Sequence, residues 1–167
     1  MGAVLQTGFL ETYLTLPVIG WRLIIASLLG AVIGIEREWK SRPAGLKTHA
    51  LTALAAALFT IVMLEILHAP GLGLDHVQVD PIRIIEAVTA GVAFLAAGAI
   101  IQSRGEVKGL TTGAAMWLAG AVGVAAGLGY IGIAVIAVGI CLFVIGGLGL
   151  LSQKREPDPA PEQTPAG

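Results

Sequence analysis

Five apolar stretches, each of about the length that crosses a lipid bilayer, most strongly limit how this chain can fold. The hydrocarbon core of a bilayer is about 30 Å thick, so a spanning helix needs roughly 20 apolar residues. Composition agrees, because 56% of the residues are hydrophobic and only 13% are charged, whereas soluble domains typically carry about 25% charged residues. The sequence predicts an all-α, polytopic membrane bundle whose five transmembrane helices lie at about 17–37, 49–67, 82–102, 111–128 and 130–151.

The segments on either side of this transmembrane domain, residues 17–151, have a different character. Residues 1–16 are expected to form an exposed or interfacial lead-in. The first 21 residues contain no Lys or Arg, so the positive n-region of a cleavable signal peptide is missing. Residues 152–167 are rich in Pro, Glu and Ala. Such a composition cannot bury a core, so we expect a disordered tail.

The basic residues predict the orientation in the membrane. Cytoplasmic loops of membrane proteins carry an excess of Lys and Arg. Only Arg22 and Arg83 fall on one side of the predicted bundle. The other eight fall on the opposite side: Arg37, Lys40, Arg42, Lys47, Arg104, Lys108, Lys154 and Arg155. We therefore expect the N-terminus outside and the C-terminus in the cytoplasm. The net charge of −1 provides no basic field for nucleic acid.

Glycine recurs at regular spacing in the predicted helices. Small residues let helix backbones approach closely in lipid, where no hydrophobic force drives helices together. The candidate helix-packing positions are Gly30, Gly34, Gly113, Gly120, Gly127, Gly132, Gly139 and Gly146. A compact bundle is one interpretation of this pattern, and a glycine-lined permeation path is the other.

The two helical hairpins also resemble each other in sequence. Gly45-Leu46-Lys47-Thr48-His49-Ala50 aligns with Gly109-Leu110-Thr111-Thr112-Gly113-Ala114. A true duplication would be a parallel repeat related by an axis along the membrane normal. Bias toward Ala and Gly alone can produce such matches, so both interpretations stay open.

Charges and helix starts come together on the predicted cytoplasmic side. Helix N-termini attract anions, and Glu36 and Glu38 are the simplest occupants. A phosphate or an acidic partner is the alternative. Carboxylates at membrane depth usually have a partner, and Arg37 or a base from a neighbouring loop would serve Glu36. The predicted cytoplasmic functional cluster is Glu36, Arg37, Glu38, Lys47, Thr48, His49, Arg104 and Lys108.

A second charged cluster is expected on the outer side: Arg22, Glu65, Asp80, Arg83 and Glu86. Three acids against two bases leave one surplus carboxylate, which could hold a proton or a cation. Mg²⁺ is commonly bound by one or two carboxylates, and a solvated rim is the alternative. No metal ligands are assigned and no cofactor is expected, although Mg²⁺ is possible. The sequence contains no nucleophile elbow, phosphate loop or Cys/His metal cluster, so we do not expect an enzyme.

Several separated motifs between about residues 20 and 150 suggest a family. They are Gly34-Ile35-Glu36-Arg37-Glu38, Pro43-Ala44-Gly45-Leu46-Lys47-Thr48-His49-Ala50-Leu51, Asp80-Pro81-Ile82-Arg83-Ile84, the run 91–101, and Lys108-Gly109-Leu110-Thr111-Thr112 followed by Trp117. Together they resemble the signature of the MgtC/SapB family of bacterial inner-membrane proteins. The family typically has Gly where Ala93 and Ala96 stand here, which would alter helix packing.

The resemblance implies a multi-pass protein of the bacterial inner membrane that is associated with magnesium homeostasis. For members of some pathogens, the resemblance also implies a role in survival under magnesium limitation. Longer members carry a soluble C-terminal domain, so this chain resembles the short, membrane-only form. Two functions follow as hypotheses. One is a small regulator that acts on another membrane complex through helix contacts and basic loops, and the other is a homo-oligomeric Mg²⁺ transporter or channel.

Overall fold

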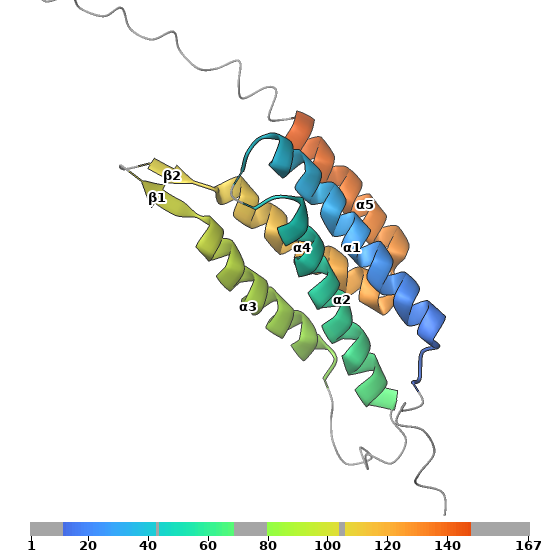
Figure 1. The fold of residues 1–167 in the computed structure, drawn as a ribbon. Coiled ribbons are helices and arrows are strands. Elements are labelled where there is room, and N and C mark those ends of the chain that lie inside the picture. Colours follow the sequence, from blue (N-terminus) through green and yellow to red (C-terminus); the bar gives the residue numbers. More distant parts are fainter. Residues whose placement is uncertain (1–11, 43, 69–79, 104–105, 148–167) are drawn as a thin grey trace, which may run out of the picture.

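A computed structural model describes residues 12–42, 44–68, 80–103 and 106–147 of the protein. Successive helices run up and down beside one another (Figure 1). The helices are α1 (Leu16–Trp39), α2 (Leu46–His68), α3 (Ile82–Ala99), α4 (Leu110–Leu128) and α5 (Ile131–Leu142), which continues into the π-helical turn η2 (Phe143–Gly147). Two short antiparallel strands, β1 (Ile101–Ser103) and β2 (Glu106–Lys108), connect α3 to α4. The predicted all-α bundle is thus present, with one small hairpin added.

Four helices, α1 to α4, are long and apolar enough to cross a membrane. The fifth apolar helix, Ile131–Gly147, is shorter. At the α-helical rise it is about 25 Å long, slightly less than the hydrocarbon core. The protein is therefore a multi-pass helical membrane protein, and the fifth span remains a prediction. The predicted lead-in 1–16 and tail 152–167 fall largely or wholly outside the described residues.

The predicted extension of the third helix to residue 102 is wrong. The helix ends at Ala99, Ile100 has an extended backbone with ψ of 112°, and the chain enters β1. Two consecutive β-branched isoleucines, Ile100 and Ile101, favour this extended conformation. The hairpin then returns the chain to Gly109, whose φ of 91° is readily adopted only by glycine.

Two backbone hydrogen bonds close the end of α1, where the chain turns toward α2. The amide of Ser41 donates to the Glu38 carbonyl at 2.9 Å, and that of Arg42 donates to the Arg37 carbonyl at 3.0 Å. This pair of bonds is the Schellman pattern, in which the residue at the Ser41 position is left-handed and usually Gly. Ser41 adopts that conformation with a φ of 49°. The carboxylate of Glu38 also accepts the backbone N–H of Leu46 at 2.8 Å, which ties the end of α1 to the start of α2.

Helix α4 lies at the centre of the bundle and contacts each of the other four helices. It is also the most buried of the four long helices. Glycines bring it against α2: a Cβ at Gly127 would lie 2.8 Å from the Ala57 carbonyl oxygen and 2.8 Å from Thr60 Cβ. Gly123 lies similarly close to Ala53 and Ala56. The α2–α4 interface is therefore a close approach of two backbones.

The candidate packing glycines divide into two groups. Close helix contacts occur at Gly30, Gly34, Gly113, Gly120 and Gly127. No atom of the described residues lies within 4 Å of the position that a Cβ would occupy at Gly132, Gly139 or Gly146. The prediction that these three are helix-packing positions is therefore wrong for the described bundle, where Ala134, Val138 and Cys141 of α5 and Ile145 of η2 face the core instead.

Candidate functional site

One end of the bundle carries the α1–α2 turn and the β1–β2 hairpin, and we call it the basic end (Figure 1). At this end Arg37 is only 4% exposed. Its Nε donates to Glu36 Oε2 at 2.5 Å, and its Nη2 contacts the same oxygen. Lys40 Nζ lies 2.7 Å from Glu36 Oε1. The predicted pairing of Glu36 with Arg37 is therefore observed. It neutralises a charge that would otherwise be costly to bury.

His49, in the first turn of α2, is completely buried. Its Nδ1 lies 2.8 Å from the carbonyl oxygen of Gly45. A carbonyl only accepts hydrogen bonds, so Nδ1 carries the proton and Nε2 of the neutral ring is an acceptor. Nε2 is buried and has no hydrogen-bond partner among the described residues. Complete burial of the ring disfavours its positively charged form.

Thr112, near the start of α4, is 1% exposed, and its hydroxyl has no hydrogen-bond partner within the described part of the chain. The buried hydroxyls of Thr52 and Thr60 each donate to the carbonyl four residues earlier, at 2.8 Å. Four residues before Thr112 is Lys108, which lies in β2 and not in the helix. The usual intrahelical acceptor is thus missing at Thr112. At the basic end, Arg37, His49 and Thr112 are thus buried and Glu36 is partly buried.

Four of the remaining residues of the predicted cytoplasmic cluster lie on the surface of the basic end. Glu38 accepts the Leu46 amide, so it occupies the N-terminus of α2 as the sequence predicted. Lys47, Thr48 and Lys108 are exposed. Arg104 lies outside the described residues. The sequence did not reveal that Thr112 is buried. The available signal was a hydroxyl in the first turn of an otherwise apolar, Gly-rich helix.

At the opposite end, the predicted outer residues bind backbone groups instead of forming one cluster. Arg22 Nη1 donates to the carbonyl of Gly127, at the last turn of α4, at 2.8 Å. The Glu65 carboxylate accepts the amides of Tyr13 and Leu14, at 2.6 and 3.0 Å.

Just before α3, Asp80 Oδ1 accepts the amide of Ile82 at 2.9 Å, and Arg83 and Glu86 on α3 are exposed. No group of three or more His, Cys, Asp or Glu side chains suited to a metal ion occurs within residues 12–42, 44–68, 80–103 and 106–147. Glu65 therefore holds Tyr13 and Leu14 of the lead-in, and Asp80 holds the start of α3.

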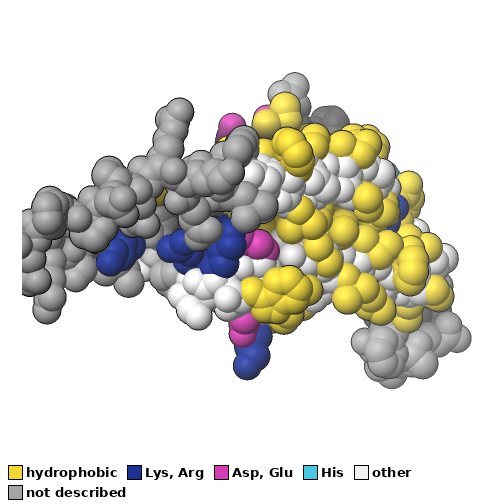
Figure 2. All heavy atoms as spheres, turned by 90° about the horizontal axis from the view of Figure 1, so that it is seen from above, with side chains coloured by type: hydrophobic (Ala, Val, Ile, Leu, Met, Phe, Trp, Pro, Cys, Tyr) yellow, Lys and Arg dark blue, Asp and Glu magenta, His cyan; other side chains and the backbone are white. Residues whose placement is uncertain are grey.

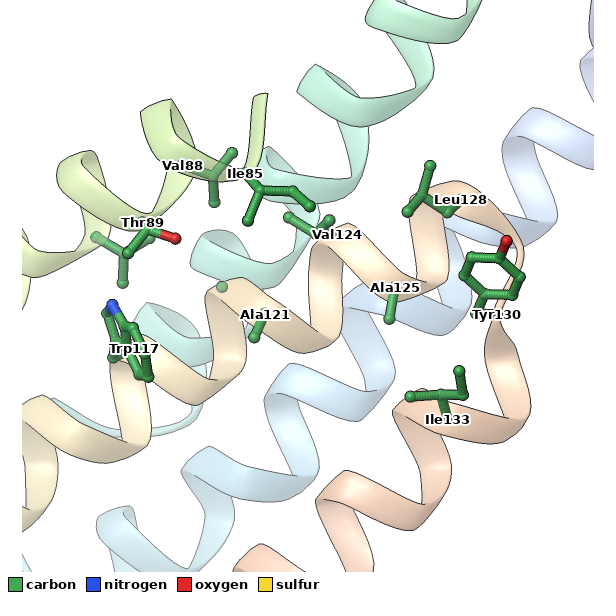
Figure 3. Close-up of a pocket in the computed structure, with 12 residues that line it drawn as sticks. Ile85, Val88, Thr89, Trp117, Ala121, Val124, Ala125, Leu128, Tyr130 and Ile133 are labelled. Carbon is green, nitrogen blue, oxygen red and sulfur yellow. The ribbon is translucent and has the colours of Figure 1, made fainter. Parts of the chain in front are cut away.

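A lateral groove of about 320 Å³ lies between α3 and α5, with α4 as its floor (Figure 3). Val88 and Val124 form part of its apolar wall, and Trp117 and Tyr130 stand toward opposite ends in Figure 3. On the floor of the groove, Ala121 is exposed and Ala125 is half-buried. The central helix is therefore only partly covered along this face.

These features define a multi-pass helical membrane protein with an ion pair buried at one end. The chain belongs to the MgtC family, whose model matches residues 23–154. The matched range contains Glu36, Arg37, His49 and Thr112, and also the glycines of the α1–α2 and α2–α4 contacts.

Three relatives illustrate the similarity. The "Putative magnesium transporter YhiD" of Escherichia coli K12 is 43% identical over 108 residues, which are 65% of this chain and 50% of the relative. "Protein SapB" of Bacillus subtilis is 40% identical over 116 residues, 68% of this chain and 49% of the relative. "Protein MgtC" of Salmonella typhimurium LT2 is 40% identical over 107 residues, 64% of this chain and 42% of the relative. The chain thus spans about half the length of the curated relatives it matches. No solved structure matches the chain.

Proposed function

We propose that this protein is a small integral protein of the bacterial inner membrane that acts in adaptation to low magnesium as a regulator of another membrane complex. Family membership and the name of the relative YhiD, a putative magnesium transporter, support the link to magnesium. The distribution of basic residues supports a topology with the N-terminus outside, the C-terminus in the cytoplasm and five spans. A reporter that is active only outside the cytoplasm tests this topology: fused at Gly73 it is active, and fused after Leu151 it is silent.

The observation that carries the regulatory proposal is the engagement of the carboxylates. Glu36 pairs with Arg37 and Lys40. Glu38, Glu65 and Asp80 each accept backbone amides. Mg²⁺ needs carboxylate or phosphate oxygens and keeps much of its water shell. Carboxylates that already bind the chain's own cations and amides are poorly placed to bind Mg²⁺ as well.

The packing of the bundle also favours regulation over transport. Gly30 and Gly34 bring α1 onto α2, and Gly123 and Gly127 bring α4 onto α2. The core between these helices is therefore filled by backbone contact. In contrast, α3 exposes Phe94 and Leu95, α5 exposes Ile136, and η2 exposes Phe143. Membrane-facing apolar surfaces of this kind are available for contact with other membrane proteins.

An oligomeric Mg²⁺ transporter is the second candidate. The name of YhiD, a putative magnesium transporter, favours it. So does the glycine face of α5 at Gly132 and Gly139, where copies of the chain could approach closely. A transport path would then lie between subunits.

The growth of a deletion strain and its initial rate of Mg²⁺ uptake distinguish the two candidates. We expect the deletion to slow growth in low-magnesium medium and a plasmid copy of the gene to restore it. Under the regulatory proposal, the initial rate of Mg²⁺ uptake per cell is unchanged by the deletion. A loss of uptake that tracks the amount of protein supplied from the plasmid would contradict regulation and favour transport. Unchanged growth at every magnesium concentration would contradict both.

A further inference from the structure

The α1–α2 turn carries more positive charge than its own carboxylates neutralise. Residues 36–47 contain two Glu and four Lys or Arg. Glu36 is taken by Arg37 and Lys40. Arg42 and Lys47 are both exposed, and neither forms an ion pair within the described part of the chain. The surface of the turn therefore presents two cations.

A large aromatic side chain lies in the same turn. Trp39, the last residue of α1, is 83% exposed, more than any other large hydrophobic side chain that the structure describes. Figure 2, which looks down on this end, shows Lys and Arg side chains close to exposed hydrophobic surface. Tryptophan is enriched at the headgroup level of bilayers, where its ring is apolar and its N–H remains accessible to polar groups.

The backbone of the turn holds these groups in place. The two Schellman bonds fix residues 40–42, and the Glu38 carboxylate anchors the start of α2 through Leu46. Arg42 therefore belongs to a hydrogen-bonded helix end, and Lys47 lies in the first turn of α2. A ligand that binds between them contacts helix ends that are already formed, which reduces the entropic cost of binding.

We propose that Trp39, Arg42 and Lys47 form a docking surface for the headgroup of an anionic phospholipid. The phosphate complements the two cations, and Arg can bind two of its oxygens through its planar guanidinium. The indole lies beside the glycerol region. A lipid fits better than a soluble anion because the turn caps a membrane-length helix, so the exposed ring lies at the bilayer surface. This inference does not depend on the regulatory role.

Lipid retention by the purified, detergent-solubilised protein tests the proposal. The protein is titrated with phosphatidylglycerol or phosphatidylcholine, and bound lipid is counted by native mass spectrometry. Each Lys or Arg near an anionic surface contributes about fivefold in affinity, so neutralising two costs about 30-fold. We expect a preference for phosphatidylglycerol that Arg42→Gln with Lys47→Gln reduces by that factor. The charge-preserving pair Arg42→Lys with Lys47→Arg retains most of it.

Arg83→Gln is the matched control, because Arg83 is an exposed cation at the opposite end of the bundle. It leaves the preference for phosphatidylglycerol unchanged. Equal retention of phosphatidylglycerol by the double glutamine variant overturns the proposal, and so does an equal loss in Arg83→Gln. Inorganic phosphate is added in a separate arm. If it displaces the lipid at millimolar concentration, the surface binds soluble anions and the lipid assignment is wrong.

Discussion

Replacing Gly34 by alanine tests how closely α1 and α2 approach each other. The added Cβ would lie 2.6 Å from Leu46 Cα, 2.8 Å from the Gly45 carbonyl oxygen and 2.9 Å from the Leu46 nitrogen. All three are backbone atoms, so no side chain can rotate away to make room. The helices must move apart instead, at the turn that Glu38 ties together.

The magnitude follows from two opposing effects. Overpacking a well-packed core typically costs about 1–3 kcal/mol, and contact with backbone atoms places this site in the upper part of that range. Replacing Gly by Ala within a helix recovers about 1 kcal/mol. We therefore expect Gly34→Ala to lower the free energy of unfolding by about 1–2 kcal/mol.

Gly139→Ala is the control, because no heavy atom of the described residues lies within 4 Å of a Cβ at that position. Only the helix-propensity gain applies there, so this variant is unchanged or more stable by up to about 1 kcal/mol. Denaturant titration in detergent micelles, followed by circular dichroism, measures both variants. The reasoning fails if Gly34→Ala is as stable as Gly139→Ala.

Four further substitutions give distinct results in the same unfolding assay. Glu36→Gln leaves the charge of Arg37 buried without its partner, so we expect a loss of about 3–5 kcal/mol; a loss below 1 kcal/mol would mean that the pair is effectively solvated. Ser41→Gly relieves a left-handed residue and is expected to stabilise the protein by up to about 1 kcal/mol, and destabilisation would contradict the turn geometry. Thr112→Val removes a buried hydroxyl that has no partner and should not destabilise the protein, whereas Thr52→Val breaks a bond to the backbone and costs about 0.5–1.5 kcal/mol; the reverse order would show that the Thr112 hydroxyl is bonded.

The spans were predictable because the thickness of the bilayer determines the length of an apolar helix, so α1 to α4 begin and end within a few residues of the predicted positions. The pairing of Glu36 with Arg37 and the position of Glu38 at the start of α2 were predictable for a related reason, since charges at membrane depth need partners. The faces of α5 were not predictable. A seven-residue spacing places Gly132, Gly139 and Gly146 on one stripe, but spacing does not say which way the stripe points.

Residues at helix ends were also outside the reach of sequence patterns. Whether Arg37 is buried or exposed depends on how α1 is rotated against its neighbours, and that rotation is set by Gly30 and Gly34 at the α2 contact. The same holds for Thr112, which loses its intrahelical acceptor only because a strand comes immediately before α4. Both effects arise from tertiary structure and leave no periodic signal.

The central claim is that this protein acts on another membrane complex and does not carry Mg²⁺ itself. Mg²⁺ flux into proteoliposomes that contain only this protein, measured with a trapped fluorescent indicator under an inward gradient, tests it most directly. If the protein acts only on another membrane complex, we expect the same Mg²⁺ flux as in protein-free liposomes at every protein density. A saturable flux that rises with protein density and is lost in Glu36→Gln would contradict it.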